Sequence, residues 1–296
     1  MMNFKSGFVG IWGRPNVGKS TFLNQVLGQK IAIVSAKPQT TRKLIKGILH
    51  REDAQIVFVD TPGLHVPQDG LGKFMLQEAR DALVDLDLLC YLVDPFVKVE
   101  EETEYLSWLE SFEKPVFLIL NKKDLLPAEE VARRIFQRLG EHFPFREKMT
   151  VSALTGEGIE GVVQKIVEYL PPGPPYYEEG VLSDAFERDI AAEIIREKVW
   201  WYTFEEVPYG VEVQVEEFKE KNEVLYIRAL IYVERESHKK IVIGEGGKTL
   251  KKIGQSAREE IEAQWGRKVF LDLWVKVEKN WRKREDVLRR WGYRVR

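Results

Sequence analysis

The sequence predicts an α/β fold with a mostly parallel sheet, followed by a smaller α+β domain. Over residues 1–172, apolar strand-like runs alternate with helix-like segments, which is typical of βαβ units. The run Pro171-Pro-Gly-Pro-Pro175 then interrupts all regular structure, so we expect a stiff linker over residues 173–181. A second domain is expected over residues 182–296, with the apolar pattern of a helix, two strands, a helix and a strand.

In the first domain every segment with chemical character lies just after a predicted strand. Open α/β sheets bind their ligands at that edge of the sheet. We expect strands at Phe8–Trp12, Lys43–Leu49, Gln55–Val59, Leu86–Val93, Val116–Leu120 and Met149–Val151, and helices at Lys19–Leu27, Phe74–Val84, Glu101–Phe112, Ala128–Phe143 and Gly158–Leu170.

The second domain begins with Phe186, Ile190 and Ile194, whose spacing of four predicts a helix that buries all three. Alternating apolar residues over 211–215 and 225–233 predict a hairpin that turns near Lys221-Asn222. A helix with Leu250, Ile253, Ala257 and Ile261 on one face and a strand at Val269–Val275 complete the domain, before a basic C-terminal tail.

Composition indicates a globular protein of the cytoplasm. The formal net charge is -2, so any basic surface for a nucleic acid must be local. The one cysteine, Cys90, lies in an apolar run and is expected to be a buried thiol. We see neither a signal peptide nor an apolar stretch long enough for a membrane span.

A phosphate-binding loop is the first of four chemical segments. The pattern G-x-x-x-x-G-K-[ST] fits Gly13 to Ser20, where the two glycines turn backbone N–H groups toward phosphate oxygens. Lys19 supplies positive charge to the β- and γ-phosphates, and the Ser20 hydroxyl is placed to ligate Mg²⁺. The expected nucleotide-binding residues here are Gly13, Arg14, Pro15, Asn16, Val17, Gly18, Lys19, Ser20 and Thr21.

The second segment, Asp60-Thr61-Pro62-Gly63, follows a strand and carries a carboxylate suited to positioning Mg²⁺. The backbone N–H of Gly63 is expected to sense the γ-phosphate. Between the phosphate loop and this strand lies Lys37-Pro-Gln-Thr40-Thr41-Arg42, where one threonine hydroxyl would complete the metal shell when the loop closes. We favour Thr41 over Thr40.

The last two segments select the base. The carboxylate of Asp124, in Asn121-Lys122-Lys-Asp124, can accept two adjacent N–H donors from guanine, a pair that adenine lacks. The segment Ser152-Ala153-Leu154 follows the next strand and completes this part of the site. The four segments together predict a site for GTP.

With these motifs, and with Pro-Gln-Thr-Thr-Arg and a C-terminal G-x-x-G loop, the whole chain resembles the Era family of small translation-factor-type GTPases. The resemblance implies a Ras-like P-loop GTPase domain followed by a type II KH domain. It also implies binding of the 3′ end of small-subunit ribosomal RNA and a role in assembly of the small ribosomal subunit. GTP and Mg²⁺ are the implied ligands, and a monomer is expected.

One departure from the Ras pattern concerns hydrolysis. Leu64 stands where Ras-type proteins carry a glutamine that orients water, so slow intrinsic hydrolysis is expected unless another element assists. The resemblance implies that Asn16 ligates K⁺ near the β–γ bridge; the alternative is that Arg42 or a partner supplies the charge. The catalytic candidates are Asn16, Lys19, Thr41 and Gly63, and the metal candidates are Ser20, Thr41 and Asp60 for Mg²⁺ with Asn16 for K⁺.

The G-x-x-G loop at 244–247 is the expected RNA clamp, because glycines allow phosphates to approach a helix N-terminus closely. Glu245 departs from the usual basic residue and should point away or weaken backbone contact. The basic tail interleaves with Trp281 and Trp291, which suits stacking on bases, although the same spacing would also pack it on the domain. The RNA-binding candidates are Ile243, Gly244, Glu245, Gly246, Gly247, Lys248, Lys251, Lys252, Arg282, Lys283 and Arg284.

Two other classes of function compete with this interpretation. A membrane-associated signalling GTPase could use the KH-like fold as a protein-binding module. The basic tail could also make peripheral contact with anionic lipid on the inner face of the cell membrane. A metabolic kinase could use the same phosphate loop, but it would have no use for Asn121 and Asp124.

Overall fold

The computed structural model describes residues 4–34, 41–64 and 67–293. They fall into two compact units, each described here by itself. The first unit comprises Met1–Val66 and Met75–Asp184, and the second comprises Pro67–Phe74 and Ala185–Arg296. Thr40 and the residues of the Lys37-Pro-Gln segment lie outside the described residues.

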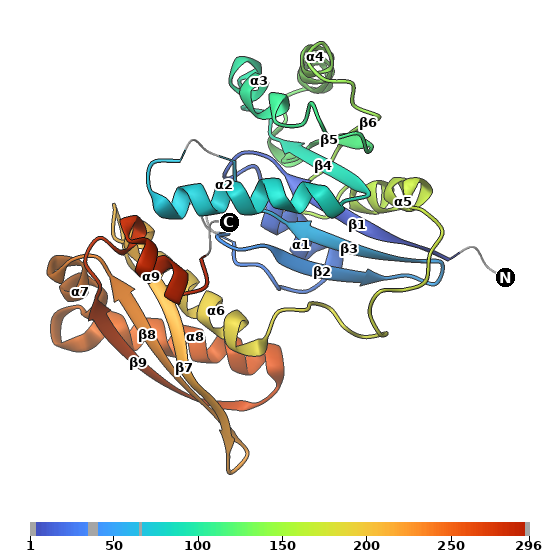
Figure 1. The fold of residues 1–296 in the computed structure, drawn as a ribbon. Coiled ribbons are helices and arrows are strands. Elements are labelled where there is room, and N and C mark those ends of the chain that lie inside the picture. The colour runs from blue at the N-terminus through green and yellow to red at the C-terminus, as the bar shows by residue number, and fades with distance from the viewer. Residues whose placement is uncertain (1–3, 35–40, 65–66, 294–296) are drawn as a thin grey trace. The chain divides into compact units, whose positions relative to one another are not determined.

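The first unit is built on a six-stranded sheet of order β2-β3-β1-β4-β5-β6 (Figure 1). β2 pairs antiparallel with β3, and the other neighbouring pairs are parallel, which confirms the predicted mostly parallel sheet. The strands are β1 (Lys5–Trp12), β2 (Ile45–His50), β3 (Ala54–Asp60), β4 (Leu88–Val93), β5 (Val116–Leu120) and β6 (Glu147–Thr150).

Helices cover both faces of this sheet, so its central strands are apolar along their whole length. α1 (Lys19–Leu27) and α5 (Ile159–Tyr169) pack on one face. α2 (Gly70–Ala82), α3 (Val99–Ser107) and α4 (Glu129–Gly140) contribute to the core on the other. Cys90 is fully buried in β4, as predicted, and burial raises the pKa of its thiol.

The second unit has a three-stranded sheet of order β7-β8-β9. β7 and β8 form an antiparallel hairpin, and β9 runs parallel to β8 on the side away from β7. In chain order the elements are α6 (Glu187–Tyr202), β7 (Glu212–Lys221), β8 (Val224–Val233), α7 (Glu236–Ile243), α8 (Lys248–Trp265), β9 (Lys268–Val277) and the short α9 (Glu285–Arg290).

Two expectations for the second unit are wrong. Phe186 is 73% exposed, because α6 begins one residue later and Phe186 therefore lies outside the helical repeat that buries Ile194. The expected single helix between the second and third strands is in fact two helices, since α7 precedes the glycine loop. The hairpin turn is close to its expected place, at Asn222 and Glu223, which both have positive φ.

The last part of the segment that joins the two units, residues 182–183, lies along β2, the edge strand of the first sheet. The Ile48 backbone N–H donates to the Leu182 carbonyl oxygen at 2.9 Å, and Ser183 forms a bridge with Gly47. Upstream, the side chain of Gln55 accepts the backbone N–H groups of Tyr176 and Tyr177. We call residues 171–184 the strap. Residues 182–183 of the strap continue the sheet beyond β2.

None of the helices within the described ranges combines the length and the apolar character that crossing a membrane requires.

Candidate nucleotide and nucleic-acid sites

The phosphate-binding loop connects β1 to α1, and its sequence is fitted to this bend. Gly13 and Gly18 have φ values of 146° and 96°, and Asn16 has a left-handed φ of 66°. Asparagine tolerates that conformation better than most residues. A Cβ on Gly18 would lie 2.3 Å from the Asn121 amide nitrogen, so glycine is required there by packing as well as by backbone conformation.

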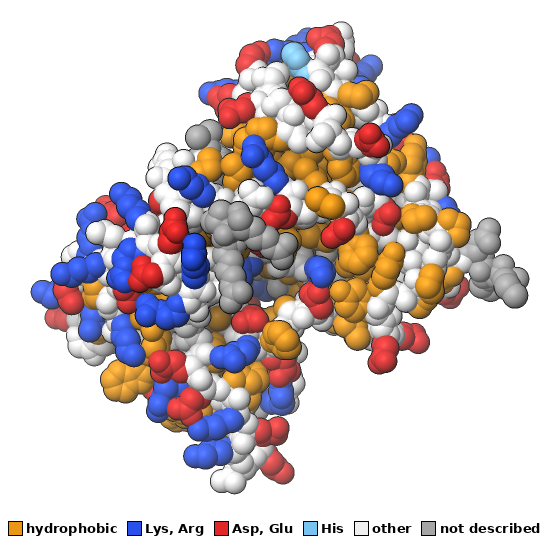
Figure 2. All heavy atoms as spheres, in the orientation of Figure 1, with side chains coloured by type: hydrophobic (Ala, Val, Ile, Leu, Met, Phe, Trp, Pro, Cys, Tyr) orange, Lys and Arg blue, Asp and Glu red, His pale blue; other side chains and the backbone are white. Residues whose placement is uncertain are grey.

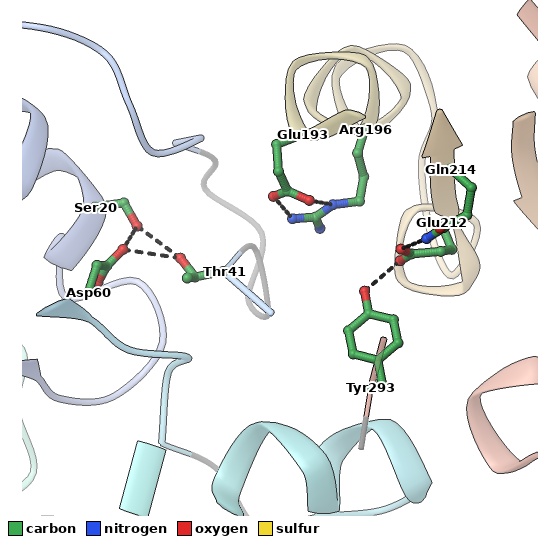
Figure 3. A network of polar contacts seen from close by, with 8 residues as sticks. All are labelled: Ser20, Thr41, Asp60, Glu193, Arg196, Glu212, Gln214 and Tyr293. Carbon is green, nitrogen blue, oxygen red and sulfur yellow. Dashed lines mark hydrogen bonds and ion pairs between the residues drawn. The ribbon is translucent and has the colours of Figure 1, made fainter. Parts of the chain in front are cut away.

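Three oxygen-bearing side chains meet at the start of α1 (Figure 3). The Ser20 hydroxyl lies 2.7 Å from Asp60 Oδ2 and 3.0 Å from the Thr41 hydroxyl. Thr41 lies 3.4 Å from the same carboxylate oxygen. The second carboxylate oxygen of Asp60 is buried without a hydrogen-bond partner. A set of hard oxygen ligands with one unsatisfied oxygen fits Mg²⁺, which prefers a few protein oxygens together with phosphate and water.

Within the described residues no group of three or more His, Cys, Asp or Glu side chains is placed so that it could hold a metal ion. Thr41, the favoured switch threonine, lies beside Ser20 and Asp60, whereas Thr40 is outside the described residues.

Opposite charges at this site are both fully buried. Burial is the main reason that the pKa of Asp60 rises to about 6 and that of Lys19 falls to about 8, although each charge partly offsets the effect on the other. The Lys19 ammonium donates to the carbonyl oxygens of Gly13 and Arg14, each at 3.0 Å. The lysine is thus held inside the loop where phosphate oxygens would lie.

A small cavity of about 50 Å³ opens beside this group. It is lined by Asn16, Lys19, Ser20, Thr41 and Gly63, so the structure brings together all the catalytic candidates. Gly63 is close to the loop: a Cβ there would lie 3.0 Å from Pro15. The same cavity is also lined by Thr21, by Gly18 and by two residues that the motif search missed, Ile33 and Val34.

The base-selecting segments lie together after β5 and β6. The Ser152 hydroxyl donates to Asp124 Oδ1 at 2.5 Å, which holds the carboxylate in one orientation. The Asn121 amide donates to the Val17 carbonyl at 2.8 Å and accepts the Ala153 backbone N–H at 2.9 Å. One side chain therefore fixes the phosphate loop relative to the base-selecting segment, a connection that the motifs alone do not reveal.

Of the remaining motif residues, Thr61 and Lys122 hold neighbouring segments through hydrogen bonds. The Thr61 hydroxyl donates to the Ile11 carbonyl, and Lys122, with a left-handed φ of 59°, donates to Asp94 at 2.7 Å. Pro62 follows Thr61 in the segment after β3, and Leu154 is 74% exposed beside the buried Ala153.

Arg14 ties the phosphate loop to α3. Its guanidinium lies 2.7 Å from Glu101 and 3.6 Å from Glu102, and Glu102 is buried and accepts a hydrogen bond from the Tyr91 hydroxyl. Burial raises the pKa of Glu102. This contact was not foreseen, because α3 is distant in sequence from the loop and no motif marks its acidic first turn.

The predicted RNA clamp lies between α7 and α8 in the second unit. Gly244, Gly246 and Gly247 all have positive φ, at 73°, 58° and 79°, so the loop depends on glycine. Glu245 points into solvent and lies 3.8 Å from Lys248, as its departure from a basic residue suggested. Ile243 is the last residue of α7, and Lys251 and Lys252 are exposed on α8.

An open groove runs from this loop between α8 and β9. Its volume is about 490 Å³, and Gly247, Lys251 and Arg258 lie along one side while Phe270 and Leu273 lie along the other. Cationic side chains above an apolar floor suit a single strand whose backbone and bases make different contacts.

The basic tail packs on the second unit with its tryptophans inward. Trp281 and Trp291 are buried, and their rings meet edge to face with centroids 5.2 Å apart. The Trp281 indole donates to the Gly210 carbonyl. Arg282 donates to Glu234 at 2.8 Å, and Arg284 pairs with Glu278 and Asp286. Lys283 is exposed. The tryptophans therefore have the packing role that was the alternative to base stacking.

Comparisons with known proteins agree with this division of sites. A family model described as a 50S ribosome-binding GTPase matches residues 8–122, and a KH domain model matches residues 206–282. The chain is 48% identical to the GTPase Era of Caldanaerobacter subterraneus subsp. tengcongensis, over 99% of each protein. It is 46% identical to the GTPase Era of Halothermothrix orenii, over 99% of this chain and 100% of that relative.

Two solved structures resemble the chain along its length. One is Era in complex with MgGDPNP and nucleotides 1506–1542 of 16S ribosomal RNA, with a TM-score of 0.95 and 38% identity over 99% of this chain and 100% of the other. A variant of Aquifex aeolicus Era bound to GDP·AlF4⁻ gives a TM-score of 0.94 at 39% identity with the same coverage.

The geometry of Asp124 predicts how the base is selected. Asp124→Asn replaces one acceptor oxygen by a donor, so we expect GTP affinity to fall on the order of 100-fold or more, with ATP affinity little changed and xanthine nucleotides favoured. Titration of fluorescent GTP, ATP and XTP analogues measures this. Glu129→Gln, a change of the same kind on the exposed start of α4, serves as the control. Equal affinity of the native protein for GTP and ATP would contradict the assignment.

Proposed function

The chain belongs to the Era family of GTPases, and from that premise we propose that it uses GTP hydrolysis to control its binding to the 3′ end of small-subunit ribosomal RNA. The observation that carries the proposal is that one chain carries the residues of both candidate sites. Asp124, Asn121 and Lys19 support a guanine-nucleotide site, and the positive φ values of the glycines at 244–247 support a clamp for a nucleic acid. The Era complex with 16S ribosomal RNA supports the choice of RNA.

The nucleotide site would hold GTP with Mg²⁺ on Ser20, Thr41 and Asp60, where the ion would neutralise charge on the phosphates. Lys19 binds and orients the phosphate oxygens, and the backbone N–H groups at the start of α1 do the same. Leu64, 1% exposed, has no polar group with which to orient water. The charge that assists hydrolysis must therefore come from elsewhere, and we assign it to K⁺ held by Asn16, which lines the phosphate cavity.

The K⁺ assignment has a direct test. We expect faster GTP hydrolysis in KCl than in NaCl, and we expect Asn16→Ala to remove that difference and to slow turnover in KCl about tenfold or more. Asn16→Asp keeps the size of the side chain and adds charge, so it should retain part of the K⁺ dependence. If the native protein turns over equally fast in the two salts, the cation role is wrong and Arg42 or a partner becomes the candidate.

For the RNA site, the glycine loop and the groove beside it support contact with a single strand. Phosphates would lie against Gly246, Gly247 and the N-terminus of α8, and Lys248, Lys251 and Lys252 would supply charge. Arg282 and Arg284 already have acidic partners, so we propose Lys283 as the tail residue with the largest share in RNA contact.

Gly247→Asp is the cleanest test of the clamp. Its Cβ would meet no atom within 4 Å, whereas a Cβ on Gly244 would lie 2.2 Å from the Thr249 hydroxyl and disturb the loop itself. We expect Gly247→Asp to abolish binding of single-stranded RNA, measured by fluorescence anisotropy, and to leave GTP binding intact.

Gly266→Asp is the matched control for this variant. Gly266 also has positive φ and open space around its Cβ position, but it lies at the other end of α8. It should cost similar backbone strain without changing RNA affinity. Native RNA affinity in Gly247→Asp would show that the KH domain of this chain serves another purpose.

Coupling between the two sites would make the protein a switch. The strap leads from the β2 edge directly into α6, and β2 itself begins four residues after Thr41. In addition, residues 67–74, which follow Gly63 closely in the chain, group with the second unit, where Asp69 lies 3.5 Å from Arg282. Short stretches of chain therefore join the two segments that we expect to respond to the γ-phosphate to β2 and to residues 67–74, which lead toward or belong to the second unit.

We expect the GTP form to bind RNA more tightly than the GDP form, by about 5- to 150-fold if the coupling is typical. Titration of one ribosomal 3′-end oligonucleotide against the protein with a non-hydrolysable GTP analogue and with GDP measures the difference. Linkage requires RNA to change the preference for GTP over GDP by the same factor, which nucleotide competition checks independently. Equal dissociation constants would leave two independent sites.

We further propose a monomer that acts in the cytoplasm on the small ribosomal subunit during its assembly. Peripheral contact with the cell membrane has less support, because Trp281, Leu288 and Trp291 of the tail are buried and do not present an apolar side to lipid.

A further inference from the structure

Among the described residues, no helix covers one face of the second unit's sheet along most of its length. Leu225, Ile227 and Ala229 of β8 point to the helix-covered side and are buried. The residues that alternate with them in β8, and the β9 residues paired with those, point to the opposite side of the sheet. α9 covers one end of this second face, where the ring centroids of Trp291 and Tyr232 lie 4.7 Å apart. The remainder, which we call the aromatic face, consists of Tyr226, Arg228, Phe270, Asp272 and Trp274.

Large aromatic side chains on this face are exposed. Phe270 is 59% and Trp274 58% exposed, and they occupy the same side of β9 because they are four residues apart in a strand. Tyr226 lies directly across the ladder from Phe270, and their rings are nearly parallel, with centroids 5.7 Å apart. Exposed aromatic residues grouped in this way are unusual on a surface that contacts only water.

A central carboxylate holds two of the rings, Tyr226 and Trp274, and the Phe270 ring stacks on Tyr226. Asp272 accepts hydrogen bonds from the Tyr226 hydroxyl at 3.2 Å, from Arg228 Nε at 2.9 Å and from the Trp274 side chain. Although partial burial opposes it, these bonds lower the pKa of Asp272, so the acceptor stays charged. Ring orientation is therefore set before any ligand arrives, which reduces the entropy that binding must overcome.

Charge on the aromatic face is balanced internally. Arg228 pairs with Glu217 as well as with Asp272, and Lys219 also pairs with Glu217. Figure 2 shows basic and acidic side chains intermixed in the same way over the view that it draws. A surface without net charge offers little to phosphate groups. The face instead offers flat rings. Lys219 Nζ and Arg228 Cζ lie 5.3 and 5.8 Å from the centroid of the Tyr226 ring. Flat rings of this kind suit nucleobases.

The aromatic face is continuous with the groove beside the glycine loop. Phe270 borders the groove that Lys251 and Arg258 also line, while its ring stacks on Tyr226 of the aromatic face. This is geometrically permitted because β9 is the edge strand of the sheet. From Phe270 to Trp274 the strand rises about 13 Å, or four residues. A single strand that leaves the groove at Phe270 would thus meet a second ring within a short distance.

We propose that Phe270 and Trp274 form a base-stacking site for unpaired nucleotides of the bound RNA that extend beyond those held at the glycine loop. The site rests on the RNA binding proposed above and adds to it a sequence-tolerant contact made by rings instead of by charge. The loop holds the backbone of about four nucleotides. The aromatic face then lengthens the strand that the chain recognises.

The test compares two lengths of single-stranded RNA by anisotropy, one of about four nucleotides and one of about ten. Phe270→Ala and Trp274→Ala should each weaken binding of the longer strand by about 5- to 20-fold. Trp274→Ala should leave the affinity for the shorter strand unchanged. Trp274→Tyr should restore most of the loss, because a ring that can stack is again present.

Salt dependence separates stacking from phosphate contact. Trp274→Ala removes no charge, so the slope of affinity against salt concentration should stay at its native value, whereas Lys251→Ala should reduce the slope by about one. Trp201→Ala is the matched control, since Trp201 is 52% exposed but lies on α6. It should not change the affinity for either strand.

The outcomes distinguish this site from the function on which it rests. If the native protein binds neither RNA, or if Gly247→Asp binds like the native protein, the proposed clamp fails. If the native protein and the controls behave as expected but both alanine variants bind the longer strand with native affinity, the stacking site is overturned. A protein partner would then be the better candidate for the aromatic face.

Discussion

The buried pair of opposite charges formed by Lys19 and Asp60 is the constraint on which the nucleotide site depends. Burying a single ionised group costs free energy. That cost raises the pKa of Asp60 and lowers the pKa of Lys19, and both shifts favour the uncharged form. Together the two groups are tolerated at the point where β1 and β3 end. The loop, α1 and the two hydroxyl groups near Asp60 are arranged around this pair, so the site is electrostatically shaped for phosphate and a divalent cation.

Much of the nucleotide site could be predicted from sequence because its parts are local. The loop glycines, Lys19 and Ser20 are contiguous, and backbone conformation at a turn is a local property. What could not be predicted arises between distant segments. Nothing near Arg14 in the sequence indicates that Glu101 and Glu102 hold it, and nothing near Gly18 shows that Asn121 excludes a Cβ. Only the pairing of parallel strands brings these residues together.

The second unit was harder to predict, for a different physical reason. Spacing identified the faces of α8 and the alternation in β8, but at Phe186 the helix had not yet begun, and periodicity carries no information about where a helix starts. In the tail, interleaved basic and aromatic residues fitted two roles equally well. Buried partners decide between them: Tyr293 donates to Glu212 at 2.8 Å (Figure 3), and the Trp281 indole donates to the Gly210 carbonyl.

The strap has a consequence for the handling of this chain in solution. β2 is the outermost strand of its sheet, and an edge strand with unpaired N–H and C=O groups is a template for association with other chains. Residues 182–183 satisfy part of that edge, and Ser183 also donates to the Lys46 carbonyl at 2.7 Å. A fragment that ends before Pro171 would lose this cover. It would retain the nucleotide site yet be prone to aggregate, so a stable isolated GTPase domain needs to extend through Asp184.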